Sequence, residues 1–133
     1  MANIFKLNIV SQDRETISLE AKSLYTKNSD GFIEFLANHT SIISSTIPTI
    51  TTIEKSDGTK RRIFTSYGII SIKDNILNFC CDSVNLVEEI DKERAKKAKE
   101  RAEKRLAENN QDIEIDIERA KRALARANAR LEL

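Results

Sequence analysis

Short apolar runs separated by turn residues fill the first two thirds of the chain. The runs are rich in Ile, Val, Phe and Thr, which favour strands, and Gly, Asn, Asp and Ser cluster between them. Asp57–Gly58 between two such runs is a strong hairpin signal. Many short strands at this spacing predict an antiparallel sandwich or a flattened barrel. The expected strands cover residues 4–10, 23–27, 32–36, 42–45, 49–55, 61–66, 69–73 and 76–81.

From about Glu88 onward, the spacing of apolar residues becomes that of a helix. One stripe consists of Ala95, Ala98, Ala102 and Leu106, and a second of Ile113, Ile117, Ala120, Leu124, Ala127 and Leu131. The polar stretch 109–112 separates the stripes, which predicts two helices in an antiparallel hairpin. Because the first stripe is mostly alanine, the helices bury little apolar area, and we expect the hairpin to be held closed only weakly.

Composition divides the chain into residues 1–86 and residues 87–133. The second part holds 13 of the 22 Lys and Arg residues, 12 of the 21 Asp and Glu residues, and no aromatic residue. That charge density suits exposed helices with many ion pairs better than a large core. We therefore expect a β-sandwich domain over 1–86 and a helical hairpin domain over 87–133, with the junction at 90–95.

Several classes of function are disfavoured by the sequence. The net charge of +1 argues against a general nucleic-acid binder, and the apolar runs are too short to span a membrane. Adjacent Cys80 and Cys81 point to opposite faces of a strand, so a disulfide between them is not expected. The only histidine, His39, has no triad or metal-site partners nearby in the sequence, and no glycine-rich phosphate loop occurs. The sequence therefore predicts a soluble, cytosolic protein that is not an enzyme and can dock on a membrane complex.

Arginines recur along single faces of the two predicted helices. Arg94 and Arg101 are seven residues apart, and the second helix carries Arg119, Arg122, Arg126 and Arg130 at intervals of three and four. In an antiparallel hairpin these rows can converge on a polyphosphate. Asp91 opens the first helix, where its carboxylate favours the helix N-terminus and could also accept bonds from a base or ribose. The alternative is that these arginines are solvated and paired with helix acids such as Glu118.

Four stretches resemble the ε-subunit family of bacterial F-type ATP synthases, and together they cover essentially the whole chain. Residues 31–39 keep the first Gly, the Leu and the His of the family's Gly-Glu-x-Gly-x-Leu-Pro-Gly-His stretch, and 64–69 resemble its Ser-Gly-Gly-Phe segment. Ile90–Asp91–x–x–Arg94–Ala95 fits the family's Ile/Leu-Asp-x-x-Arg-Ala motif without a mismatch. Residues 120–131 resemble the second helix of the family.

The resemblance implies an α+β fold, with an N-terminal antiparallel β-sandwich of about ten short strands and a C-terminal two-helix antiparallel hairpin. It implies a non-catalytic subunit of the central rotor stalk, peripheral at the cytoplasmic face of the bacterial cell membrane. The implied partners are the γ subunit, the c-ring and the α/β catalytic head, and the implied role is to couple ion-driven rotation to ATP synthesis. The extended hairpin would inhibit ATP hydrolysis, and the folded hairpin would lie on the sandwich. No cofactor is obligatory, but ATP is a regulatory ligand in some members.

The resemblance also assigns residues by position. The ATP contacts would be Ile90, Asp91, Arg94, Ala95, Arg101, Arg126 and Arg130. The γ subunit would meet Ser11 and His39, the c-ring would meet Asp30, Gly31 and Phe32, and the inhibitory contacts would be Arg119, Lys121, Arg122 and Arg126.

Two positions depart from the family pattern. Nucleotide-binding members have a glutamate where this chain has Asn85, whose amide can still hydrogen-bond an adenine edge. Phe32 replaces a family glutamate, so a polar contact to the c-ring becomes apolar. Two other interpretations stay open: a stand-alone nucleotide-sensing module, and a structural adaptor with an inert helical tail.

Overall fold

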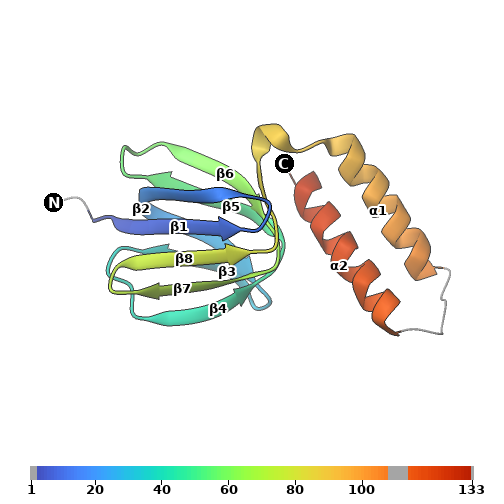
Figure 1. Ribbon diagram of the computed structural model, residues 1–133, viewed down its shortest axis with the longest axis horizontal. Helices are drawn as coiled ribbons and strands as arrows, with labels where there is room; N and C mark the ends of the chain where they lie inside the picture. The colour runs from blue at the N-terminus through green and yellow to red at the C-terminus, as the bar shows by residue number, and fades with distance from the viewer. Residues whose placement is uncertain (1–2, 108–113, 133) are drawn as a thin grey trace.

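Nine strands form a two-layer sandwich, and two helices lie beyond one end of it (Figure 1). The computed structural model describes residues 3–107 and 114–132. The strands are β1 (Phe5–Ser11), β2 (Arg14–Asn28), β3 (Gly31–Leu36), β4 (Ile42–Thr46), β5 (Thr49–Lys55), β6 (Lys60–Thr65), β7 (Gly68–Lys73), β8 (Ile76–Cys81) and β9 (Val84–Leu86). A turn of 3-10 helix, η1 (Val87–Glu89), leads to helices α1 (Lys92–Ala107) and α2 (Glu114–Leu131). The predicted sandwich followed by a helix pair is confirmed, with nine strands in the described residues instead of about ten.

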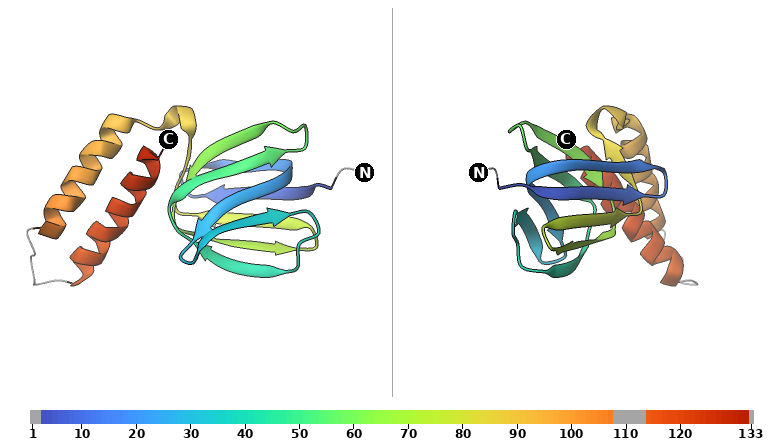
Figure 2. Two further views of the ribbon diagram at one scale, coloured as in Figure 1. Left: turned by 180° about the vertical axis from the view of Figure 1, so that it is seen from behind. Right: turned by 60° about the vertical axis from the view of Figure 1, so that its left-hand side comes forward.

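The strands follow one hydrogen-bonded path, β4-β7-β8-β1-β2-β5-β6-β9, and β3 is added to β2. The 15-residue strand β2 belongs to both layers, because its first half pairs with β1 and its second half pairs with β3 and β5. Figure 2 shows the two layers facing each other. All pairs are antiparallel except β1 with β8, which run parallel. This parallel pair departs from the all-antiparallel expectation.

Strict alternation along β8 shows how the sequence builds the core. Leu77, Phe79 and Cys81 point inward and are buried, whereas Ile76, Asn78 and Cys80 between them are exposed. The two cysteines are free and face opposite sides of the sheet, as predicted. Burial raises the pKa of the Cys81 thiol, so this side chain behaves as a small neutral core residue.

Three threonine hydroxyl groups form a buried chain across β2, β5 and β6. The Oγ1 atom of Thr51 lies 2.8 Å from Oγ1 of Thr26 and 2.7 Å from Oγ1 of Thr65, and all three residues are fully buried. Burying a hydroxyl group is costly unless it has a hydrogen-bond partner. Thr51, which is bonded on both sides, therefore satisfies two neighbours at once.

Replacing Thr51 with valine is expected to lower the free energy of unfolding by about 1–3 kcal/mol, because it leaves the hydroxyls of Thr26 and Thr65 without their shared partner. Thr51→Ser keeps the hydroxyl group between Thr26 and Thr65 and should lower the free energy of unfolding by less. Thr52→Val, on the opposite face of β5, serves as the control. Urea denaturation measures the free energy of unfolding of each variant. Equal stability of Thr51→Val and the unaltered chain would contradict the role of Thr51 as the shared hydrogen-bond partner.

The helix pair packs through alanine. Its buried residues are Ala95 and Ala102 on α1 and Ala120, Ala127 and Ala129 on α2. Ala127 and Ala129 lie on nearly opposite sides of a helix with about 3.6 residues per turn, so α2 is covered on two sides. One side contacts α1 and the other contacts the sandwich at β5, and Figure 1 shows α2 between them. The alanine contact between the helices was predicted, but the second buried face was not.

The predicted break at 109–112 and the first residue of the second stripe, Ile113, lie outside the described residues. The weak closure of the hairpin stays a prediction. No helix within the described ranges is long and apolar enough to cross a membrane.

Candidate functional site

A cavity of about 350 Å³ lies at the start of α1, beside the end of α2. It falls within the size range of small-molecule sites, about 300–1,000 Å³. Its lining consists of Asn85, Glu89, Ile90, Asp91, Arg94, Ala95, Ala98, Arg101 and Arg130. All the residues expected to contact ATP, except Arg126, therefore line one cavity.

Asp91 fixes the start of α1 and so positions the first turn of the helix against the cavity. Its Oδ1 accepts a hydrogen bond from the backbone N–H of Arg94 (3.1 Å), and its carbonyl oxygen accepts one from the N–H of Ala95 (3.0 Å). A side-chain acceptor at this place satisfies an N–H group that the helix leaves unpaired. Arg94 and Arg101 then lie two turns apart along the same face of α1.

Three arginines line the cavity, together with the carboxylates of Glu89 and Asp91. In the part of the chain that the structure describes, no carboxylate pairs with Arg94, Arg101, Arg126 or Arg130. Burial, and then the charges of Arg126 and Arg94, lower the pKa of Arg130. Glu118, considered above as a partner for the arginines, instead lies 3.8 Å from Nζ of Lys121. Converging guanidinium groups of this kind favour an anionic ligand.

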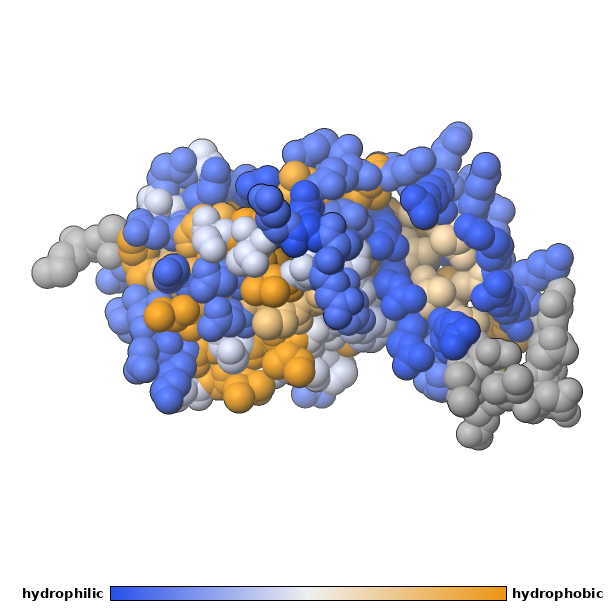
Figure 3. Space-filling view, in the orientation of Figure 1, coloured by the Kyte–Doolittle hydropathy of each residue, from blue (hydrophilic) through white to orange (hydrophobic). Residues whose placement is uncertain are grey.

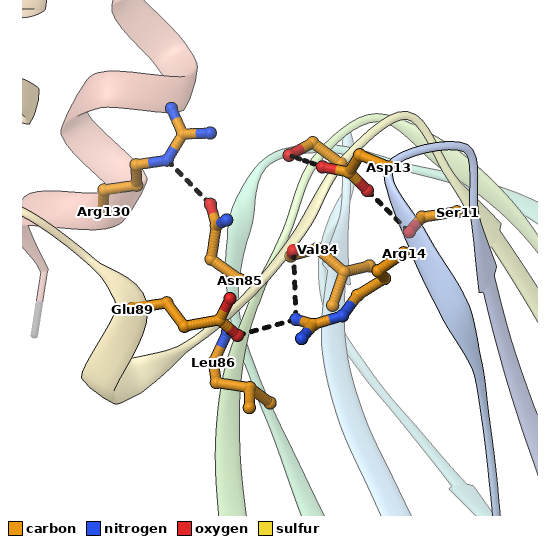
Figure 4. A network of polar contacts seen from close by, with 9 residues as sticks. Ser11, Asp13, Arg14, Val84, Asn85, Leu86, Glu89 and Arg130 are labelled. Atoms are coloured by element: carbon orange, nitrogen blue, oxygen red, sulfur yellow. Dashed lines mark hydrogen bonds and ion pairs between the residues drawn. The ribbon is translucent and has the colours of Figure 1, made fainter.

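Arg130 joins the end of α2 to the sandwich through two contacts (Figure 4). Its Nε–H donates to Oδ1 of Asn85 on β9 (3.2 Å), and its Cζ lies 4.2 Å from the ring centroid of Phe64 on β6. Ile63 and Thr65 point into the sandwich, so Phe64 between them faces the other way. Phe64 is nevertheless completely buried, and α2 contributes to this burial through Arg130. We call Phe64, Asn85 and Arg130 the latch. Nothing in the local sequence pattern identified Phe64 as part of this site.

A second polar network ties the connection between the domains to the turn between β1 and β2. Nη1 of Arg14 donates to Oε1 of Glu89 (2.8 Å) and to the carbonyl oxygen of Val84 (3.5 Å), and the N–H of Leu86 also donates to Oε1 of Glu89 (3.1 Å). Asp13 accepts hydrogen bonds from Ser11 and from Ser83 beside them. Figure 4 shows these groups around the start of β9. These contacts tie the connection to the sandwich as far as Glu89.

The carboxyl group of Glu89 is expected to titrate below the ordinary value of 4.5, because the hydrogen bond from Arg14 and then that from Leu86 lower its pKa. Because the pKa is lowered, the Glu89 carboxylate stabilises the anchored connection at pH values above the ordinary pKa. This contribution is lost as the pH falls through the lowered pKa. A carbon-13 NMR titration of Glu89 measures the shift. Arg14→Leu should return the pKa toward 4.5, whereas Arg62→Leu on β6 should not. An unchanged titration in Arg14→Leu would contradict the ion pair.

Ser11 and His39, the residues expected at the γ subunit, lie at opposite ends of β1. Ser11 ends the strand and donates to Asp13. His39 Nδ1 lies 2.7 Å from the carbonyl oxygen of Thr40, in the loop after β3. That loop reaches the start of β1 through Asn75, which accepts from the N–H next to His39 and donates to Ile4. One partner can meet both residues only along the length of the sheet.

The turn expected at the c-ring carries an exposed aromatic stack. Gly31 has φ of +133°, a backbone conformation that side chains disfavour, and Asp30 N–H donates to the side chain of Asn28 (2.9 Å). Phe32 is 60% exposed and stacks on Tyr25 at a centroid distance of 5.1 Å, and Nζ of Lys27 lies 5.3 Å from its ring centroid. Of the residues expected to inhibit hydrolysis, Arg119, Lys121 and Arg122 are exposed on α2, and Arg126 is half-buried.

A β-sandwich joined to a helical hairpin at an arginine-lined cavity defines a two-domain subunit of the ATP synthase delta/epsilon type. The family model for the beta-sandwich domain of the ATP synthase delta/epsilon chain matches residues 4–87, and that for its long alpha-helix domain matches 88–133. The ATP synthase epsilon chain of Clostridium botulinum (strain Eklund 17B / Type B) is 44% identical over 110 residues, which are 83% of this chain and 82% of the relative. That of Clostridium perfringens (strain SM101 / Type A) is 43% identical over 111 residues, 84% of each chain.

Solved structures have the same fold. A chain of the Euglena gracilis mitochondrial ATP synthase matches 99% of this chain and 81% of its own length, with a TM-score of 0.81 at 24% identity. A chain of the Tetrahymena thermophila mitochondrial ATP synthase matches 96% of this chain and 93% of its own length, with a TM-score of 0.64 at 10% identity. The chain therefore belongs to the ATP synthase epsilon chain family, whose members are non-catalytic subunits, and the predicted family and non-enzymatic class are confirmed.

Proposed function

We propose that this chain is the ε subunit on the central rotor stalk of an F-type ATP synthase, peripheral at the cytoplasmic face of a bacterial membrane. It contacts the γ subunit and the c-ring, and it couples ion-driven rotation to ATP synthesis in the catalytic head. The names of the bacterial relatives support this role, as do the titles of the two solved assemblies, which name the c-ring in both and the central stalk in one. Its helical hairpin inhibits ATP hydrolysis and responds to ATP.

The observation that carries the docking role is an apolar outer face on β4, β7, β8 and β1. Ile69 on β7, Cys80 on β8 and Val10 on β1 lie in one cross-strand row, with Ile43 on β4 next to it. Ile43 is 75% exposed and Ile69 is 57% exposed, and Figure 3 shows apolar residues over this part of the sandwich. Exposed apolar patches of this kind mark protein interfaces. We place the γ contact on this face.

The regulatory role rests on the shallow helix pair and the charged cavity beside it. Alanine contacts bury little area, so a ligand that binds only the closed hairpin shifts the balance between closed and extended forms. At a hundredfold excess over its Kd, such a ligand stabilises the closed form by about 2.7 kcal/mol. In the extended form, the exposed Arg119, Lys121 and Arg122 are available to acidic surfaces of the head.

Removing residues 88–133 from the subunit in the assembled complex tests this proposal. The sandwich face remains, so ATP synthesis driven by the ion gradient is expected to persist, whereas ATP hydrolysis is expected to rise. A full-length subunit with Arg119, Lys121 and Arg122 all changed to alanine is the matched variant, and it should also raise hydrolysis. Unchanged hydrolysis in both would favour an adaptor with an inert tail. Failure of the full-length chain to copurify with a γ subunit would favour a stand-alone module.

A further inference from the structure

We infer that Asn85 acts as a positioning residue for Arg130 rather than as a reader of the base, so that the cavity binds nucleoside triphosphates through their phosphates with little selection between bases. This inference rests on the proposed response to ATP and specifies the class of ligand. It also replaces the expectation that Asn85 hydrogen-bonds an adenine edge.

The orientation of the Asn85 amide follows from its partner. The Nε–H of Arg130 can only donate, so Oδ1 of Asn85 is the atom turned toward it, at 3.2 Å. The Nδ2 group, which carries two donors, then occupies the other side of the amide, as Figure 4 shows. The exocyclic amino group of adenine is itself a donor and cannot accept from Nδ2, whereas N7, which can accept, is present in adenine and guanine alike.

One oxygen of each carboxylate that lines the cavity is engaged within the chain. Oε1 of Glu89 accepts from Arg14 and from the N–H of Leu86, and Oδ1 of Asp91 accepts from the N–H of Arg94. The apolar part of the lining is small: Ile90, Ala95 and Ala98. Aliphatic side chains pack on the face of any base, so this wall does not distinguish adenine from guanine.

The donors for phosphate, by contrast, are held in place. The ring of Phe64 and the amide of Asn85 fix the guanidinium plane of Arg130, and no described residue binds Nη1 or Nη2. Figure 4 shows both terminal nitrogens turned away from Asn85. Such a pair of parallel donors suits a phosphate, which it grips with two hydrogen bonds. Arg94 and Arg101 line the same cavity and add further donors.

Calorimetry on the full chain with ATP, GTP and inorganic tripolyphosphate tests the inference. ATP and GTP are expected to bind within about threefold of each other, with tripolyphosphate within about tenfold of both, because the charge-assisted hydrogen bonds of the phosphates dominate. Asn85→Leu releases Arg130 and should weaken all three ligands by a common factor of about ten. Asn85→Asp keeps an oxygen acceptor for Arg130 and should restore binding. Asn128→Leu, at an exposed position on α2, is the matched control and should change nothing.

The Nε–H resonance of Arg130 gives a second readout that a general loss of structure would not reproduce. It is expected to move in Asn85→Leu and to return in Asn85→Asp. If ATP binds ten times more tightly than GTP, and Asn85→Leu abolishes that difference, Asn85 reads the base. The inference then fails, while the proposed response to ATP stands. If none of the three ligands binds the unaltered chain, both the response to ATP and this inference fail.

Discussion

Replacing Gly68 with alanine is expected to lower the free energy of unfolding of the sandwich by about 1–3 kcal/mol. The added methyl group would clash with the backbone of the neighbouring strand, which cannot move aside as a side chain can. A Cβ atom at Gly68 would meet the carbonyl oxygen of Cys80 well inside normal contact distance and would lie 3.0 Å from Cα of Cys81. Both atoms belong to β8, which pairs with Gly68 directly. The substitution therefore pushes apart the two strands that join β4 to the rest of the sheet.

Thermal and urea denaturation measure this effect. For a domain of this size, each kcal/mol corresponds to about 4–8 °C in Tm. Ile69→Ala on the same strand is the control, because Ile69 is 57% exposed and its loss should cost less than about 0.5 kcal/mol. If Gly68→Ala were as stable as Ile69→Ala, the close approach of β7 and β8 would not be a constraint on this position.

Replacing Arg130 with alanine is expected to have the largest effect on function, because this side chain contributes both to the latch and to the cavity. The change removes a charge-assisted hydrogen bond to Asn85 and the stacking on Phe64, together about 2–3 kcal/mol in favour of the closed hairpin. It also removes a phosphate donor from the cavity. We therefore expect ATP binding to fall by more than about tenfold and the extended form to gain population.

Distance measurements between one probe on the sandwich and one on α2 report the closed population directly, and calorimetry reports ATP binding. Arg122→Ala, which removes an exposed arginine from the same helix, should leave both unchanged. Arg130→Lys keeps the charge but loses the planar guanidinium group, so it should recover only part of the binding. A closed population that is unaltered in Arg130→Ala would show that the alanine contacts alone hold the hairpin.

The sequence predicted most of the fold because most of it is local. Alternating residues such as those of β8 and the Asp57–Gly58 turn specify strands and a hairpin without reference to distant residues. The first half of β2 was not predicted, because most residues from Arg14 to Lys22 are polar. This half of the strand belongs to only one layer of the sandwich. The three-residue strand β9 is too short to have a pattern, and it exists because β6 offers it an edge.

The candidate site was predicted in part for the same reason. Arg94 and Arg101 follow from helical spacing within α1, and Asp91 follows from its place at the start of the helix. The structure brings all three to one cavity. The latch could not be found this way, because Asn85 and Arg130 are 45 residues apart and Phe64 lies on a third element. Only the way α2 packs against β5 brings these residues together, and no local pattern encodes that packing.

The parallel pairing of β1 with β8 has a consequence for synthesis on the ribosome. Lys6 is opposite Ile76, and Asn8 donates to Asn78 across 70 residues of sequence. The first strand made therefore cannot take its place until the eighth has left the exit tunnel, and contacts between such distant residues slow folding. Until then, β1 can pair only with β2. Nascent chains stalled before residue 76 should therefore remain sensitive to protease, and those that extend past Cys81 by more than the tunnel length should become resistant.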